Sequence, residues 1–368
     1  MSLKEIFCQD NAISTLQRAF AADKMPHAYI FTGEEGVGKF TTAREWAKLL
    51  LCKNPVIQNE FADSCNSCQS CQSFEASSHP DFSNVYKELL EFTKDGKDKK
   101  TPVDLPVDVI REFLIDKVSV KPTLSERKVF IISEAEKLNP SSQNALLKVL
   151  EEPPDYCCII LLCIRMENLL PTTKSRGRII RFGPVDEERI IEKLKQTGLD
   201  QIKARYFARL AQGSLGRACQ WAQLEQADAN LYQTKKELLN SLSSYKLADS
   251  LNLSHGLLEK SKKIADIWAD ILKTTSKTDI SRRAAKSLVL IIISALHDAM
   301  KLNITNPQKI INFDQKEQIK KLANRFEPEQ AIKKISDAYK TILWIDSSVN
   351  ERLIFEQLLL NLVPSDII

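Results

Sequence analysis

Residues 28–40 read AYIFTGEEGVGKF, and this stretch decides the fold of the first half of the chain. The apolar run at 28–31 is typical of a buried strand, and Gly33 is followed after four residues by Gly38 and Lys39, the spacing of a phosphate-binding loop. Glycines let backbone N–H groups converge on phosphate oxygens, and the lysine adds a compact positive charge. Residues 41–51 suit a helix, so the stretch predicts a P-loop rather than an ordinary glycine turn with a surface lysine. The nucleotide-binding candidates are Gly33, Gly36, Gly38 and Lys39.

Other short apolar runs predict further strands around this loop. They lie at residues 129–132, 157–164 and 179–182, with a fifth candidate at 82–86. Helix-length segments separate the runs, which is the pattern of a parallel sheet covered by helices on both faces. The first part of the chain is therefore predicted to have an α/β fold.

The second half is predicted to be helical. No glycine follows Gly256 and no proline lies between Val185 and Asn306, while apolar residues recur at helical spacing. One boundary is expected near residue 183, where the last strand ends, and another near residues 227–230. The predicted domains are thus 1–183, 184–228 and 229–368, with the charged stretch 94–102 as a surface loop within the first.

Composition sets limits on the class of protein. Among 368 residues, 43% are hydrophobic and 27% are charged, which excludes a disordered or fibrous chain. The longest apolar run, residues 288–295, is far below the ~20 residues that cross a bilayer, and the N-terminus lacks an export leader. A cytoplasmic protein without membrane partners is expected. The net charge of +4 is too small to predict a polyanionic partner, so any contact with nucleic acid would be local.

Two residues that normally hold Mg²⁺ beside a P-loop are missing. Phe40 stands where a Ser or Thr hydroxyl is usual, and Thr41 is rotated by ~100° along the helix. Ser133 stands at the position of the second, acidic ligand, with Glu134 behind it. Because metal clamping is central to phosphoryl transfer, the sequence predicts that this chain does not hydrolyse ATP efficiently, although ATP or ADP could still bind.

Nine cysteines without an export leader indicate metal or thiol chemistry rather than disulfides. Cys65, Cys68 and Cys71 form CNSCQSC, and Cys52 precedes them. Two-residue spacing lets neighbouring thiolates reach one tetrahedral ion, and four sulfurs close its coordination sphere. A structural Zn²⁺ site is predicted, the alternative being reduced surface thiols.

Residues 172–181, TTKSRGRIIR, break the even charge balance. They hold Lys174, Arg176, Arg178 and Arg181 without an acidic residue. Composition alone allows a solvated turn before the last strand.

Two longer stretches carry a family resemblance. LNPSSQNALLKVLEEPP at 138–154 and LLPTTKSRG at 169–177 closely resemble the bacterial DNA polymerase III clamp-loader subunits, which are AAA+ proteins. The likeness begins at residues 25–39 and touches all three predicted domains. It also includes HPD at 79–81, VDVIREF at 107–113, QGSLGRA at 212–218 and VNERLIFEQLLLNL at 349–362.

The resemblance implies an architecture and a set of partners. Residues 1–183 would be an AAA+ domain with a zinc module inserted at 52–71, residues 184–228 a small helical lid, and residues 229–368 a helical collar. The collar would join five subunits into an open ring of motor subunits, a delta subunit and this chain. The complex would place a sliding clamp on primer-template DNA during replication.

The resemblance also assigns roles to single residues. Arg176 would be an arginine finger that reaches the γ-phosphate bound by a neighbouring subunit. Arg217 matches the second sensor of the lid, although a surface salt bridge accounts for it equally well. Cys8, Ile164 and Gly177 depart from the family pattern, and Ile164 replaces a polar sensor.

The expected function is therefore a non-hydrolysing clamp-loader subunit. The first alternative is a catalytically active motor-type clamp-loader ATPase with unconventional metal ligands. The second is a free-standing module that binds zinc and nucleic acid, against which the family-like stretch at 349–362 argues.

Overall fold

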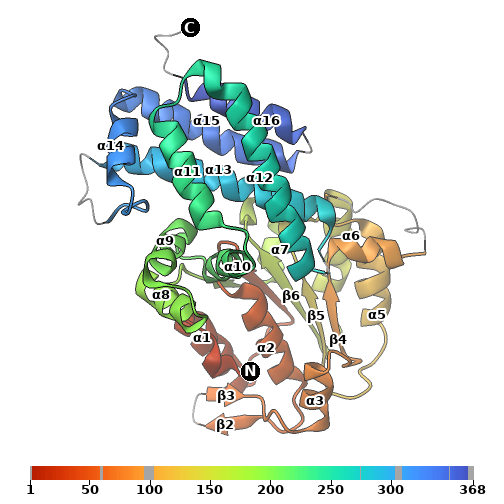
Figure 1. Ribbon diagram of the computed structural model, residues 1–368. Coiled ribbons are helices and arrows are strands. Elements are labelled where there is room, and N and C mark those ends of the chain that lie inside the picture. The colour runs from red at the N-terminus through yellow and green to blue at the C-terminus, as the bar shows by residue number, and fades with distance from the viewer. Residues whose placement is uncertain are drawn as a thin grey trace. The chain divides into compact units, whose positions relative to one another are not determined.

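The computed structural model describes residues 2–58, 61–94, 103–273, 275–302, 309–347 and 349–363. The chain forms two compact units, one of Met1–Asp186 with Gly213–Gly216 and the other of Glu187–Gln212 with Arg217–Ile368. In the described residues the first unit is α/β and the second is helical (Figure 1).

The first unit alternates strands and helices. Its main elements are α1 Asp10–Ala21, β1 Ala28–Thr32, α2 Lys39–Leu51, β2 Val56–Gln58, β3 Phe61–Asp63, α3 Gln69–Glu75, β4 Phe82–Val85, α4 Val107–Ile110, α5 Asp116–Val118, β5 Lys128–Ile132, α6 Pro140–Glu151, β6 Cys157–Cys163, α7 Pro171–Arg176 and β7 Arg178–Arg181.

Five parallel strands of the described chain form the sheet in the order β4-β5-β6-β1-β7. Strand β1 lies between β6 and β7, with Ile30 opposite Leu161 and Ile179. All four predicted strands and the fifth candidate are confirmed. The predicted end residues Tyr86, Ile164 and Phe182 lie just beyond their strands.

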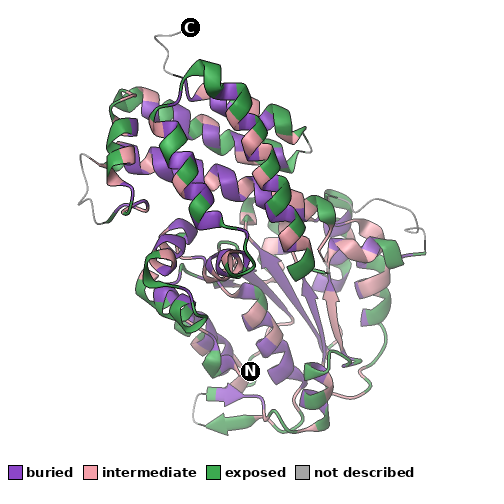
Figure 2. Ribbon diagram, viewed as in Figure 1, coloured by how far each residue is buried: buried purple, intermediate pink, exposed green. Residues whose placement is uncertain are grey.

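Alternate residues of β1 enter two different cores. Tyr29 and Phe31 pack with Trp46 of α2 on one face, while Ile30 packs with Leu146 of α6 on the other. Figure 2 shows the central strands buried. Helices therefore cover both faces of the sheet, as apolar strands of this kind require. The loop after β1 emerges at the carboxyl edge, where open α/β sheets bind ligands.

The described residues of the second unit form helices that lengthen from α8 to α13 and are shorter after it. They are α8 Glu187–Gln196, α9 Gln201–Ala211, α10 Leu215–Gln226, α11 Leu231–Ser243, α12 Ser250–Ile271, α13 Lys277–Lys301, α14 Lys316–Ala323, α15 Pro328–Asp346 and α16 Glu351–Asn361; the first two residues of α10 belong to the first unit. Trp221 of α10 is buried, and its indole N–H donates to Ser287 of α13 at 3.0 Å. Predicted segments 184–228 and 229–368 both contribute to this unit, and the boundary between them stays a prediction.

The remaining expectations concern loops and membranes. Of the predicted surface loop at 94–102, residues 95–102 lie outside the described part of the chain. Among the described helices, none combines the length and the hydropathy that a membrane span needs.

Candidate functional site

The P-loop connects β1 to α2 at the carboxyl edge of the sheet. Gly33, Gly36 and Gly38 all have positive φ, and at Gly33 a Cβ would lie 2.5 Å from the carbonyl oxygen of Phe182. Only glycine fits there. Lys39, the first residue of α2, is 8% exposed, and its Nζ donates to the carbonyl oxygens of Gly33 and Glu34 at 2.6 Å. Burial lowers the pKa of Lys39. The phosphate-loop geometry predicted from the spacing is present.

A short segment from beyond the sheet covers this loop. The hydroxyl of Ser214 donates to the backbone carbonyl oxygen of Glu35 at 2.7 Å, and the Gly216 N–H donates to that of Gly36 at 2.7 Å. A Cβ at Gly216 would lie 2.9 Å from the Gly36 Cα. Sequence reasoning did not predict this packing of two glycines, although both belong to quoted motifs.

The two positions where Mg²⁺ ligands are expected are occupied by other residue types. The Phe40 side chain is an exposed hydrocarbon, at 45%. The Ser133 hydroxyl follows β5 and donates to the Asn84 side chain at 3.2 Å. Thr42, the next hydroxyl along α2 after Thr41, is buried and bonds back to Gly38. Phe40 therefore offers no oxygen to a Mg²⁺ ion, and Ser133 offers a neutral hydroxyl in place of a carboxylate.

Glu134 is the first carboxylate after β5. It has the left-handed backbone conformation with φ 53°, and it pairs with Lys137 at 2.5 Å and with Lys87 at 4.0 Å. Glu136 instead accepts the backbone N–H of Ile164 at 3.2 Å, and burial raises the pKa of its carboxyl. Position 164 therefore offers a backbone N–H but no polar side chain.

The four predicted metal ligands converge. The Sγ atoms of Cys52, Cys65, Cys68 and Cys71 all lie within 4.8 Å of one another. Sγ of Cys65 is 3.5 Å from that of Cys52 and 4.0 Å from that of Cys71. Four Zn–S bonds of 2.3 Å require S···S separations of about 3.8 Å. The donor set and its spacing therefore fit a tetrahedral zinc ion.

Backbone amides support negative charge on these sulfurs. The N–H of Cys65 donates to Cys52 Sγ, and that of Cys68 donates to Cys65 Sγ at 3.3 Å. Burial opposes ionisation of Cys65, yet hydrogen bonds from the backbone of Ser67 and Cys68 outweigh it and lower its pKa to about 6. Burial raises the pKa of Cys71, whose thiol would ionise readily only beside a cation.

The HPD motif ties the cysteine cluster to the sheet. The Ser70 hydroxyl donates to the carbonyl oxygen of Leu51, the residue before Cys52, and Nε2 of His79 lies 2.8 Å from the same hydroxyl. The Asp81 carboxylate accepts three backbone N–H groups between Thr123 and Ser125. Burial opposes this charge, but these bonds lower the pKa of Asp81. The motif is therefore a structural support.

Arg176 is the last residue of α7. Its guanidinium lies 2.7 Å from Glu151, the last residue of α6, and it donates to the Thr172 carbonyl oxygen at 2.9 Å. The side chain is 32% exposed. Arg178 and Arg181 of β7 are exposed as well, whereas Lys174 is half-buried. Glu151 lies within the motif LLKVLEEPP, but only the fold identifies it as the partner of Arg176.

Arg217 lies in the first turn of α10, directly after Gly216 in the chain. It is half-buried and belongs to the second unit, so its relation to the P-loop is a proposal. Of the other predicted site residues, the four glycine and lysine positions of the loop come together, and so do the four cysteines.

Strand order and P-loop together place the first unit in the AAA+ class of P-loop proteins. The family model "DNA polymerase III, delta subunit" matches residues 8–186, and "DNA polymerase III, delta subunit, C terminal" matches residues 229–363. The chain belongs to the clamp-loader family of DNA polymerase III subunits.

Curated relatives carry two kinds of name. DNA polymerase III subunit delta' of Bacillus subtilis is 25% identical over 96% of both chains. Subunit delta' of Pseudomonas aeruginosa is 36% identical over 41% of each chain. Subunit tau of B. subtilis is 26% identical over 73% of this chain but only 48% of its own length. The chain thus spans about half or less of the length of several relatives it matches.

Among solved structures, a DNA polymerase III gamma-subunit-related protein from Thermotoga maritima matches 94% of this chain and 97% of its own. The identity is 17% and the TM-score is 0.40.

Proposed function

We propose that this chain is a delta-prime-type, non-hydrolysing subunit of the DNA polymerase III clamp loader. It completes a hetero-pentamer with motor subunits and a delta subunit, and it helps to place the sliding clamp on primed DNA in the cytoplasm. The observation that carries the proposal is the pair Phe40 and Ser133, because both Mg²⁺ contacts of an ATPase site are replaced in one chain. The delta' subunit of Bacillus subtilis matches this chain over 96% of both lengths, which supports the proposal.

The motor-type ATPase is the second candidate. It is favoured by the intact glycines, by buried Lys39 and by relatives named tau and gamma. The two candidates differ in one measurement, which is ATP turnover by the purified chain alone. A non-hydrolysing subunit gives background turnover, whereas a motor subunit hydrolyses ATP without its partners.

The P-loop of a non-hydrolysing subunit would still bind a nucleotide. Gly33, Gly36, Gly38 and Lys39 would hold the phosphates of ATP or ADP, and Arg217 would approach the same nucleotide from α10. Support comes from Gly216, which packs on Gly36 and precedes Arg217 directly. Binding of ADP that fails in Lys39→Ala would test this part.

Arg176 would act on the nucleotide of a neighbouring subunit. Its ion pair with Glu151 joins two partly exposed side chains, and such pairs contribute only about 0–1 kcal/mol. The guanidinium is therefore free to exchange Glu151 for a phosphate, whose charge is larger. Its position at the end of α7 presents it at the surface of the first unit.

Residues 229–368 would form the collar through which the ring assembles. Ile332, Tyr339 and Leu343 of α15 are exposed and lie seven and four residues apart, so they share one face of the helix. An exposed apolar face of this kind fits the corresponding helices of neighbouring clamp-loader subunits. Charged substitutions such as Leu343→Glu would weaken co-purification with the other subunits.

Zinc would have a structural role in this function. Cys52, Cys65, Cys68 and Cys71 would hold it and leave no coordination position for water, so the metal stabilises the module between α2 and β4. The module would fold around the ion in the manner of other small metal sites.

A further inference from the structure

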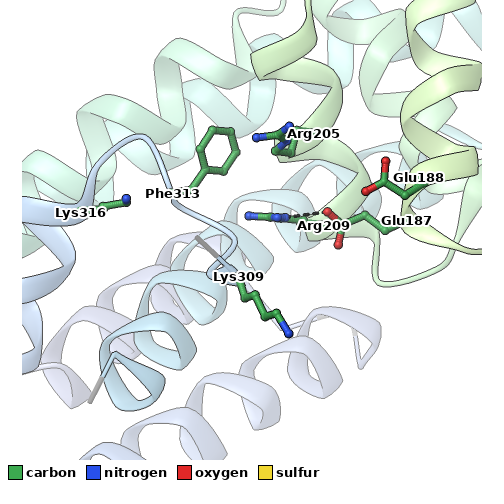
Figure 3. A pocket seen from close by; sticks show the side chains of 7 residues that line it. All are labelled: Glu187, Glu188, Arg205, Arg209, Lys309, Phe313 and Lys316. Carbon is green, nitrogen blue, oxygen red and sulfur yellow. Dashed lines mark hydrogen bonds and ion pairs between the residues drawn. The ribbon is translucent and has the colours of Figure 1, made fainter. Parts of the chain in front are cut away.

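The second unit contains a cavity that no step of the proposed function uses. It has a volume of about 430 Å³ and lies among α8, α9 and the segment that leads into α14. The residues that line it are Glu187, Glu188, Arg205, Arg209, Lys309, Phe313 and Lys316. Glu188 and Lys309 are exposed, so the cavity opens at the protein surface. Figure 3 shows the seven side chains that line it.

The side chains that line this cavity are four cations and two carboxylates besides Phe313, so their formal charges leave an excess of two positive charges. Arg209 donates to Glu187 at 2.7 Å and to the Ile310 carbonyl oxygen at 2.8 Å, so it has its partners already. Three other cations, Arg205, Lys309 and Lys316, have neither a hydrogen bond nor an ion pair to the residues that the structure describes. The acids that line the cavity are Glu187, which pairs with Arg209, and Glu188. The other three cations therefore outnumber the one remaining carboxylate.

An aromatic ring fixes the two guanidinium groups. The Arg205 Cζ lies 5.6 Å from the centroid of the Phe313 ring, and the Arg209 Cζ lies 5.3 Å from it. Both arginines reach toward the ring from α9, Lys316 lies on its other side, and Lys309 points away (Figure 3). Cation–π contact restrains a guanidinium while its N–H groups stay available to an acceptor.

Buried polar groups hold the segment that carries Phe313. The Asp298 carboxylate accepts N–H groups of Ile311 and Asn312, at 3.0 and 2.7 Å. Lys235, which is fully buried, pairs with Asp314 at 2.5 Å. Ordering a segment costs about 1–2 kcal/mol per residue, and these buried contacts offset that cost. The segment is thus held in place on both sides of Phe313 before any ligand arrives.

We propose that this cavity binds the phosphate groups of a nucleic acid or of a free polyphosphate. A polyphosphate or a nucleic-acid backbone presents acceptor oxygens on successive phosphate groups, so Arg205 of α9 and Lys316 of α14 can both bind it from the two sides of Phe313. A single carboxylate has two coplanar oxygens, which one guanidinium satisfies. The cavity volume also exceeds what one acidic side chain fills and lies in the range of small-ligand sites. An acidic peptide is therefore the disfavoured ligand.

The test measures binding of two probes to the full-length chain. Fluorescein-labelled dT15 is titrated by anisotropy at several salt concentrations, and inorganic tripolyphosphate is used as competitor and in calorimetry. Arg205→Gln and Lys316→Gln should each weaken binding by about tenfold, the loss of one charge-assisted hydrogen bond. Each should also reduce the salt slope by about one charge. All measurements are repeated in Lys39→Ala, which separates this cavity from the P-loop.

Lys321→Gln is the matched control, because Lys321 is an exposed lysine of the same helix α14 that does not line the cavity. Its binding should equal that of the unmodified chain. If dT15 binds and tripolyphosphate does not compete, the phosphate source is nucleic acid; if only tripolyphosphate binds, it is a free polyphosphate. Equal losses in Lys321→Gln, no binding of either probe, or tighter binding of an octaglutamate peptide would overturn the proposal. Thermal unfolding confirms that each variant is folded.

Discussion

Arg176 and Glu151 form an ion pair of 2.7 Å between the last residues of α7 and α6. The two residues come from the two sequence motifs that carry the family resemblance, and they lie 25 positions apart in the chain. A cation at the C-terminal end of a helix is also favoured by the helix dipole. The pair therefore keeps the arginine in a defined place while half of Glu151 and a third of Arg176 remain accessible.

Arg176→Ala should slow ATP hydrolysis or clamp loading by an assembled clamp loader without preventing assembly. An arginine finger contributes about 10³–10⁵ in rate at the ATP site it serves. Total turnover falls less than this if the other ATP sites of the complex still hydrolyse ATP. Arg176→Lys should rescue poorly because lysine lacks the planar fork. DNA-stimulated ATPase of the reconstituted complex is the measurement.

Arg178→Ala is the control for this prediction, since Arg178 is exposed on β7 two residues away. Glu151→Gln should leave activity near that of the unmodified complex, because a partly exposed ion pair contributes little. Equal effects of Arg176→Ala and Arg178→Ala would mean that the basic stretch acts as a general patch and not as a finger.

The unmodified chain should show background ATP turnover, and Phe40→Thr alone should not change it. That substitution restores one Mg²⁺ ligand while Ser133 still lacks a carboxylate. Only Phe40→Thr combined with Ser133→Asp is expected to recover some hydrolysis. Phosphate release is the assay, and substantial turnover by the unmodified protein would contradict the non-hydrolysing assignment.

The protein should purify with one zinc ion per chain, and Cys68→Ser should lose it. Removing one sulfur leaves three ligands within a cluster spaced for four, so the segment from Cys52 to Cys71 should become protease-sensitive. Elemental analysis and limited proteolysis measure the two effects. Cys219→Ser, at a half-buried cysteine of α10 outside the cluster, should keep the metal. Protein prepared without chelators that contains no zinc would refute the prediction.

Gly216→Ala should destabilise the first unit by about 1–3 kcal/mol. A Cβ there would lie 2.9 Å from the Cα of Gly36 and 3.1 Å from its carbonyl oxygen, and backbone atoms yield only with strain. Gly256→Ala is the matched control, because that glycine lies inside α12 with open space around it. It should stabilise the helix by up to about 1 kcal/mol. Chemical denaturation measures the free energy of unfolding of both variants. If both substitutions change it in the same direction, the close packing of Gly216 on Gly36 is contradicted.

Stability of the second unit should fall as pH decreases below about 6.5. Burial and Lys301 lower the pKa of His297 on α13, so the folded chain keeps this ring neutral while the unfolded chain takes up a proton. The loss is at most about 1.4 kcal/mol per pH unit. Hydrogen exchange of α13 between pH 7.5 and 5 should show it.

His297→Gln should flatten this dependence, because glutamine does not titrate. His255→Gln should not, since His255 of α12 is largely exposed, at 68%. If the two variants have the same pH profile, the half-buried ring of His297 is not the source of the effect.

The sequence by itself determined the P-loop, the α/β fold, the helical second half and the cysteine cluster. Each depends on spacing within a short segment, where the strand, turn or helix geometry fixes which residues come together. The glycines at 33, 36 and 38 and the two CxxC units are of this kind. The replacements Phe40 and Ser133 could also be recognised, because a motif defines the position of a missing ligand.

Only the tertiary structure decided which distant residues become partners. Glu151 for Arg176, Gly216 for Gly36, and Phe313 for Arg205 are separated by 25, 180 and 108 positions, and no local pattern encodes such pairs. They arise because burial of apolar helix faces fixes how helices and loops pack, and the polar side chains then meet at the edges of that packing. The cationic cavity was missed for the same reason, since its four cations come from two segments, 205–209 and 309–316, that are far apart in a chain whose net charge is only +4.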